Sequence, residues 1–150
     1  MKLKKSTIKS ILNEFNIQSG VKVVEKECSY TRFIFNRDKH DWLFKEIESI
    51  LPGKYKLKNH FRGCMYEPGD FMDPHTDGDY AYADMSGGIQ LNNEYSGGEF
   101  IIDSKKLEAE IGELFMFGRS TIHNINKVKE GIRYSLHFHI MDSTISRQLI

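Results

Sequence analysis

RYSLHFHI, residues 133–140, alternates strictly between polar and apolar side chains. Successive side chains of a β-strand point to opposite faces of the sheet. Arg133, Ser135, His137 and His139 therefore share one face, while aromatic and aliphatic residues occupy the other. A polar face of this kind, directed into a barrel lumen, is unusual as scaffold and expected at a functional site. This stretch predicts a barrel with a site inside it.

The chain around this strand, from Tyr55 onward, has the pattern of an antiparallel β-structure. Short runs of strand-forming residues are separated by glycines, among them Gly69, Gly78 and the pair Gly97-Gly98. This spacing predicts an antiparallel barrel or sandwich. The segment 104–111 fits either a helical turn or a strand. The predicted strands are 55–66, 86–92, 99–103, 113–117, 121–126 and 133–141.

Two amphipathic helices are predicted before this β-region. The first is defined by apolar residues at i, i+3, i+4 and i+7 between Ile8 and Phe15. The second is expected to begin with Asp38 as its cap and to end at Pro52-Gly53, with leucine and isoleucine at helical spacing between these points. Two short strands, 21–25 and 30–35, are predicted between the helices.

Length and charge limit the classes of protein to which the chain can belong. At 150 residues it is expected to form a single domain, and no segment approaches the ~20 consecutive apolar residues of a membrane span. Lys and Arg together number 21, as do Asp and Glu, so no overall positive field favours nucleic acid. We therefore expect a soluble, cytoplasmic protein in which Cys28 and Cys64 are reduced.

A metal site is predicted from His75 and Asp77, which are separated by one residue and can face one ion from an extended segment. Pro74 favours this, because it biases Asp73 toward extended backbone. Alone, the pair is a weak signal that many chains match by chance. With His123, on a later predicted strand, the set becomes two imidazoles and one carboxylate. This is the ligand set of non-haem Fe(II) oxygenases, and it leaves coordination positions open for reactants.

A carboxylate anchor is predicted beside the metal ligands. Arg133 follows His123 across a tight connection, residues 127–131, which would place its guanidinium on the neighbouring strand. A guanidinium is a planar fork that suits a carboxylate better than the point charge of lysine. Tyr66 precedes the metal ligands, and Ser135 shares a strand face with Arg133. Both are candidates to add hydroxyl donors to the same carboxylate.

Several motifs follow one another in a specific order between residues 55 and 141. They are YEPGDFMDPHTD (66–77), QLN (90–92) with GGE (97–99), GELFMF (112–117), His123 and GIRYSL (131–136). Together they resemble the 2-oxoglutarate- and Fe(II)-dependent dioxygenases of the prolyl 4-hydroxylase type. The ordered set is far more specific than any one of its parts.

The resemblance implies a mainly β fold, α+β by content. The expected architecture is a double-stranded β-helix, or jelly-roll barrel, with helices packed on one sheet. A single dioxygenase domain would span residues 1–150. Its buttress of helices and strands would occupy 1–54, and its jelly-roll core 55–141.

By match of position, the resemblance also assigns roles to six residues. Fe(II) would be bound by His75, Asp77 and His123, and the distal carboxylate of 2-oxoglutarate by Arg133, supported by Tyr66 and Ser135. The reaction would consume O2 and release succinate and CO2 as a C–H bond is hydroxylated, with ascorbate as a candidate reductant. Related halogenases have a small residue where this chain has Asp77, so hydroxylation is favoured over halogenation.

The sequence predicts the type of reaction more precisely than the substrate. An amino-acid residue in a peptide or protein and a free small molecule are both candidates. Prolyl 4-hydroxylases of the algal and bacterial kind carry a Tyr near Met72 and an Arg near Ala83 that help to hold a peptide. Both are missing here, which counts against a prolyl peptide. His137 and the acidic loop after Asp77 are candidates for contact with substrate.

Two other functions share parts of the pattern. Oxidative demethylases of alkylated nucleobases have the same metal ligands, but they usually carry a second Arg six residues after the cosubstrate Arg, where this chain has His139. The neutral net charge also argues against nucleic acid. The other alternative is a non-catalytic metal-binding jelly-roll module, which the combination of the metal ligands with Arg133 and Tyr66 disfavours.

Overall fold

The computed structural model describes residues 1–78 and 83–144, and within these ranges its helices precede most of its strands. The helices are α1 (Lys5–Ile17) and α2 (Arg37–Ile50). The strands are β1 (Val21–Val24), β2 (Cys28–Asn36), β3 (Tyr55–Leu57), β4 (His60–Tyr66), β5 (Phe71–His75), β6 (Met85–Gln90), β7 (Tyr95–Gly97), β8 (Phe100–Ile102), β9 (Lys105–Lys106), β10 (Leu114–Gly118), β11 (His123–Ile125), β12 (Val128–Gly131) and β13 (Arg133–Asp142).

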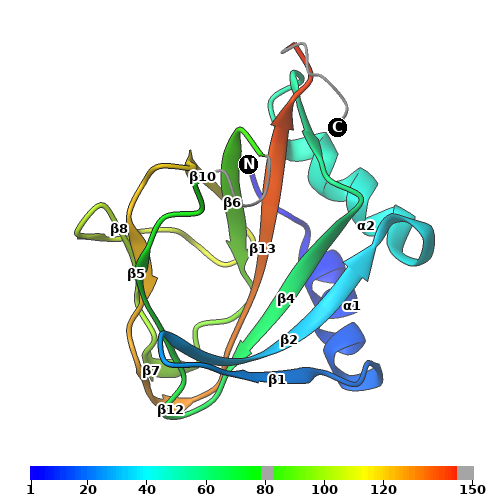
Figure 1. Ribbon diagram of the computed structural model, residues 1–150. Coiled ribbons are helices and arrows are strands. Elements are labelled where there is room, and N and C mark those ends of the chain that lie inside the picture. Colours follow the sequence, from blue (N-terminus) through cyan, green and yellow to red (C-terminus); the bar gives the residue numbers. More distant parts are fainter. Residues whose placement is uncertain (79–82, 145–150) are drawn as a thin grey trace.

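Most of the strands form one antiparallel sheet that curls around a lumen (Figure 1). Its order is β10-β6-β13-β4-β2-β5-β11-β8-β9, with β1 beside β2 and β3 beside β13, while β7 and β12 pair separately. The sheet bends at β2, because residues 31–36 pair with β4 whereas Cys28 and Ser29 pair with β5. The two limbs that meet at this bend face each other across the lumen, as in the predicted jelly roll.

The helices cover the outer face of the limb that contains β2, β4 and β13 (Figure 1). Phe15 of α1 packs on Phe33 with ring centroids 4.7 Å apart, and Phe44 of α2 packs on Phe61 with centroids 4.8 Å apart. Gly63 permits this close packing, because a Cβ at that position would lie 2.6 Å from the Phe15 ring. A second apolar cluster lies on the inner side of the sheet.

β13 shows the predicted alternation and lies at the centre of the helix-covered limb, between β4 and β6. Its apolar side chains belong to the cluster under the helices. Arg133 and Ser135 are buried on the opposite, inner face. The strand register places Arg133 opposite Tyr66 and Ser135 opposite Gln90. The polar face therefore points into the lumen, as the sequence predicted.

The predicted cap of the second helix was wrong. The helix begins at Arg37, and Asn36 is its cap, since the Asn36 side chain accepts a hydrogen bond of 2.9 Å from the Lys39 N–H. Asn36 is also the last residue of β2 and has extended backbone (φ −127°, ψ 153°). One residue thus ends the strand and caps the helix, while Asp38 lies in the first turn.

The predicted connection between the strands of His123 and Arg133 was also wrong. Residues 128–131 form β12, which pairs with β7. β11 pairs with β5 and β8, whereas β13 pairs with β3, β4 and β6, so the two strands belong to opposite limbs. His123 and Arg133 therefore meet across the lumen and not side by side in the sheet.

The remaining predictions concern the segment 104–111, the two cysteines, the acidic loop and membrane spans. The ambiguous segment 104–111 contains the short strand β9, paired with β8. Cys28 and Cys64 are both buried and unpaired. Residues 79–82 of the acidic loop lie outside the described ranges. No helix within residues 1–78 and 83–144 combines the length and the apolar character needed to cross a membrane.

Candidate metal and cosubstrate site

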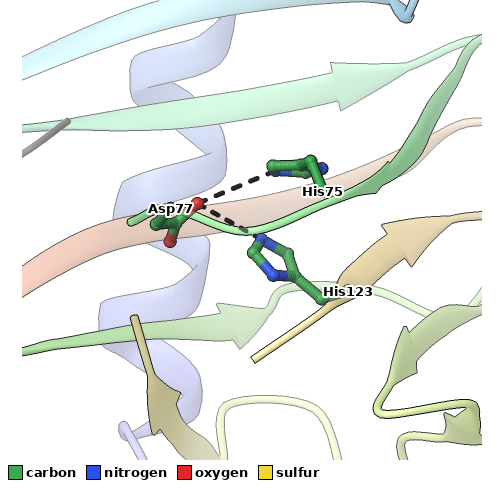
Figure 2. Close-up of side chains that lie close together, drawn as sticks. All are labelled: His75, Asp77 and His123. Carbon is green, nitrogen blue, oxygen red and sulfur yellow. Dashed lines mark ion pairs between the residues drawn. The ribbon is translucent and has the colours of Figure 1, made fainter. Parts of the chain in front are cut away.

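The three predicted metal ligands meet where β5 and β11 pair (Figure 2). His75 is the last residue of β5, His123 is the first of β11, and the register places them opposite each other. Asp77 lies beyond the end of β5, so the chain turn after the strand, and not strand alternation, brings its carboxylate to the same point. Asp77 Oδ1 is 3.7 Å from His75 Nε2 and 3.4 Å from His123 Nε2.

Backbone carbonyls fix which nitrogen of each imidazole faces Asp77. His75 Nδ1 lies 2.8 Å from the Asp73 carbonyl oxygen, and His123 Nδ1 lies 3.0 Å from that of Thr121. A carbonyl can only accept, so each Nδ1 carries the proton and donates it. Each Nε2 then faces the carboxylate and is left to offer its lone pair to a cation at their centre. Metal-bound histidines are commonly oriented by such hydrogen bonds.

The protonation states of the ligands suit a metal ion. Burial alone would raise the pKa of Asp77, but its contacts with the His123 and His137 imidazoles and the hydrogen bond from Ser86 hold it well below its usual range. Burial lowers the pKa of His75. At neutral pH the carboxylate is thus ionised and His75 is neutral, as metal coordination requires.

Ser86 orients the carboxylate, a role that the sequence did not predict. Its hydroxyl, on β6, donates to Asp77 Oδ2, and His137 Nε2 lies 3.7 Å from the same oxygen. With Oδ2 held in this way, Oδ1 is left facing His75 and His123. The pairing of β6 with β13 places Ser86 opposite His139. Only this pairing could have identified Ser86, because the sequence around it, Met-Ser-Gly-Gly, carries no motif.

A second set of ligand atoms, from Asp77, His137 and His139, also lies within 4.8 Å of one another. We favour the set with His75 and His123, because carbonyl hydrogen bonds fix the orientation of both its imidazoles. His137 Nε2 and His139 Nδ1 are buried and have no hydrogen-bond partner among the described residues. Burial lowers the pKa of both, that of His139 to about 4, so they are neutral at pH 7.

Arg133 is a buried cation without a counter-ion in the described part of the chain. Its side chain is 1% exposed. Nη1 donates to Ser135 Oγ at 2.8 Å and Nη2 to Gln90 Oε1 at 3.4 Å, while Nε has no partner there. All of these partners are neutral. A buried charge is strongly unfavourable unless it is paired, so the site calls for an anion, and the planar fork suits a carboxylate.

Tyr66 and Ser135 lie beside Arg133, as predicted. Tyr66 is fully buried, stacks on Tyr30 with ring centroids 5.4 Å apart, and faces the Arg133 guanidinium at 5.7 Å. One lumen cavity is lined by Tyr66, Arg133, Ser135 and His123 together. The structure thus places the predicted anchor and one predicted metal ligand, His123, in one cavity, while His75 and Asp77 line the neighbouring cavity at the mouth. Gln90, which the sequence did not single out as a site residue, also contacts Arg133.

Comparisons with known proteins show what the chain and its fold resemble. No family model matches the chain. The sequence is 24% identical over 156 residues to a PKHD-type hydroxylase of Prochlorococcus marinus, a similarity that covers 87% of this chain and 71% of that protein.

The structure is similar to solved structures at low sequence identity. A prolyl hydroxylase of Trichoplax adhaerens, in complex with a peptide fragment of the hypoxia inducible factor oxygen degradation domain, gives a TM-score of 0.71 at 14% identity over 96% of this chain and 82% of that chain. A 2OG-Fe(II) oxygenase family oxidoreductase of Burkholderia pseudomallei gives 0.69 at 14% identity over 90% and 78%. The chain has the 2-oxoglutarate/Fe(II) oxygenase fold.

These similarities confirm two predictions. One is the jelly roll with helices packed on one sheet, and the other is the resemblance to prolyl 4-hydroxylase-like proteins. Within this fold, the predicted metal ligands His75 and His123 come from the limb without helices. Arg133 and Ser135 come from the helix-covered limb. Asp77 faces both limbs, since it contacts the two histidines and also Ser86 of β6.

Proposed function

We propose that this protein is an Fe(II)- and 2-oxoglutarate-dependent dioxygenase. It hydroxylates an amino-acid residue in a peptide or a free small molecule, with succinate and CO2 as coproducts. The observation that carries the proposal is a His-Asp-His ligand set and a buried arginine with no acidic partner among the described residues, in two cavities that share lining residues. The ligand set alone fits several metals. The arginine adds the demand for a carboxylate, which 2-oxoglutarate meets.

The side chains of the site suit both Fe(II) and 2-oxoglutarate. Two neutral imidazoles and one ionised carboxylate would hold Fe(II), with Ser86 keeping the carboxylate in place. Arg133, with Ser135 and Gln90 beside it, would hold the distal carboxylate of 2-oxoglutarate. When bound, the metal and cosubstrate supply O2 activation coupled to oxidative decarboxylation.

Aromatic side chains make the wall of the lumen apolar around His123 and Arg133. The rings of Phe117 and Phe100 lie with their centroids 4.6 and 5.9 Å from that of His123. Phe100 also lies 5.8 Å from the Arg133 guanidinium. These apolar walls exclude water from the space between the anchor and the metal ligands, and a dry environment strengthens the electrostatic interactions within it.

The test of this function is succinate formation. The purified protein, supplied with Fe(II), 2-oxoglutarate, O2 and ascorbate, should release succinate above the rate of a protein-free control. Asp77→Ala should lower this rate by about 100-fold or more, because a missing ligand weakens the metal site. Asp41→Ala, at an exposed position of α2, is the matched control and should keep the rate. Undiminished succinate release in Asp77→Ala would contradict the proposal.

A further inference from the structure

Arg62 and Arg32 lie beside the metal ligands, and neither forms an ion pair with an acidic side chain among the described residues. Arg62 is on β4 and Arg32 on β2. The Nε atom of Arg62 is buried and lacks a hydrogen-bond partner there. Its Cζ lies 5.9 Å from the centre of the Tyr30 ring, and Cys64 is also beside its guanidinium. Arg62 thus resembles Arg133 in forming no direct ion pair among the described residues, although the Asp77 carboxylate is near enough to stabilise its charge.

A structural arginine of the same chain shows the contrast. Arg37 forms a two-pronged ion pair with Glu48, at 2.9 and 3.1 Å, and also donates to the Leu57 carbonyl at 3.2 Å. Such pairing is how a partly buried guanidinium is normally stabilised. Arg62 has no comparable partners in the described ranges. A buried, unpaired charge is costly, so a purely structural role explains its position poorly.

The position of Arg62 links three cavities. It lines the lumen cavity that holds Arg133, the cavity at the mouth that exposes His75 and Asp77, and a groove beside His139. The register places Arg62 opposite His137 of β13, on the inner face of the sheet. A molecule that enters the mouth to reach the metal ligands therefore passes Arg62.

Arg32 lines the mouth cavity and the groove together with Arg62. The register places it opposite Cys64, two residues from Arg62 along β4, so the two arginines are diagonal neighbours on one face. Arg32 is solvent-exposed, whereas Arg62 is partly buried. Together they extend a positive surface from the mouth inward to the metal ligands.

We propose that the substrate carries a carboxylate, and that Arg62 and Arg32 bind it at the mouth of the lumen; this rests on the proposed function. Arg133 is reserved for the cosubstrate, whereas Arg62 forms no direct ion pair among the described residues and is available to a second anion. A guanidinium fork matches a carboxylate in geometry. The anion is part of the substrate because the same cavity exposes the metal ligands, where the reacting carbon has to lie.

Acidic residues in the same cavity restrict the class of substrate further. Glu25, Glu27 and Asp73 line the same cavity. A phosphate backbone, with charges along its whole length, would be repelled by these carboxylates. A molecule with a single carboxylate avoids them, and an amino group on it would be attracted. The substrate class is therefore a free carboxylic or amino acid, or a carboxylate within a peptide.

The first experiment compares acids with their neutral amides. Wild-type protein with Fe(II) and 2-oxoglutarate is supplied with L-aspartate, L-glutamate or an end-blocked glycine-rich peptide with one Glu, and in parallel with the diamides of aspartic and glutamic acid, which carry no carboxylate, or the end-blocked Gln peptide. Succinate release and a product with one added oxygen are measured. We expect at least one acid to stimulate turnover on the order of 10- to 100-fold more than its amide, the difference typical of a charged hydrogen bond. If the free acids stimulate turnover, the substrate is a free acid; if the Glu peptide does, the substrate is a carboxylate within a peptide.

Two outcomes of this experiment would overturn the inference. One is equal stimulation by acids and amides. The other is no stimulation by any acid in a protein that shows the visible charge-transfer band of bound Fe(II) and 2-oxoglutarate. If that band is itself missing, the proposed function fails, and the inference fails with it.

Variants then test the two arginines. Arg62→Gln and Arg32→Gln should each raise KM for the responding acid about 10-fold or more and so collapse the ratio of acid to amide. Arg32 is exposed, so its variant serves if Arg62→Gln unfolds. Lys45→Gln, on an exposed position of α2, removes an equal charge and should keep the ratio. An unchanged ratio in the arginine variants would overturn the assignment.

Discussion

At the scale of single residues, Arg133 lowers the stability of the fold while it provides a binding site for an anion. Its guanidinium is buried among neutral partners, Ser135 and Gln90, in the described part of the lumen. A charge in this setting destabilises the folded chain until an anion binds. Arg133 is therefore placed for binding, and replacing it with an apolar side chain separates the two effects.

We expect Arg133→Met to unfold at the temperature of the wild type, or above it, when 2-oxoglutarate is absent. The wild type with Fe(II) should gain about 2.7 kcal/mol of stability at 2-oxoglutarate near 100 times Kd, and the variant should gain none. Thermal unfolding under anaerobic conditions measures both. Arg37→Met is the control, since it breaks the ion pair with Glu48 and should destabilise the protein in either condition. A variant that is less stable but still responds to 2-oxoglutarate would refute this view of Arg133.

Ser86 is the residue whose role is tested most simply. Its hydroxyl donates to Asp77 Oδ2, and Ser86→Ala leaves that oxygen free to turn away from the histidines. We expect the affinity for Fe(II) to fall about 10- to 100-fold, as when other residues that orient metal ligands are changed. Metal titration measures it. Ser143→Ala, which removes a bond to the exposed Lys54 carbonyl, should leave the affinity unchanged. Equal affinities in the two variants would show that Asp77 needs no support.

At the scale of elements, two residues near the junction of β2 and α2 are candidates to cap the helix, Asn36 and Asp38. Asn36 accepts the Lys39 N–H, whereas Asp38 lies inside the first turn. Asn36→Ala should lower the free energy of unfolding by about 1 kcal/mol, because a helix donor loses its acceptor. Asp38→Ala should cost less, since only a favourable charge near the helix start is lost. Chemical denaturation compares the two, and a larger loss in Asp38→Ala would reverse the assignment.

β13 and the strand of His123 show what sequence can predict about elements. The alternation over 133–140 arises within one strand, so the lumen-facing Arg133 and Ser135 could be predicted from sequence alone. The neighbours of a strand depend on pairing with distant segments. The prediction that His123 lies beside the Arg133 strand failed for this reason, because β12 and β7 carry the chain from one limb to the other. The role of Ser86 was missed for the same reason.

At the scale of the whole molecule, the site spans both limbs of the curled sheet. The histidine ligands come from β5 and β11, while the carboxylate anchor comes from β4, β6 and β13, which the helices support. The limbs meet at β2, where few residues pair with β5. Individual site residues could be predicted from their order along the chain, but the bend that brings the limbs together is non-local and could not. Bound metal and cosubstrate would bridge the limbs.

The most direct measurement of the central claim is an anaerobic titration followed by visible absorption. Fe(II) and 2-oxoglutarate together should give a charge-transfer band with the wild type, and neither should give it alone. Asp77→Ala should not form the band, because the metal loses its carboxylate ligand. A wild type that forms no band, or an Asp77→Ala variant that forms it undiminished, would contradict the assignment of this lumen as an iron and 2-oxoglutarate site.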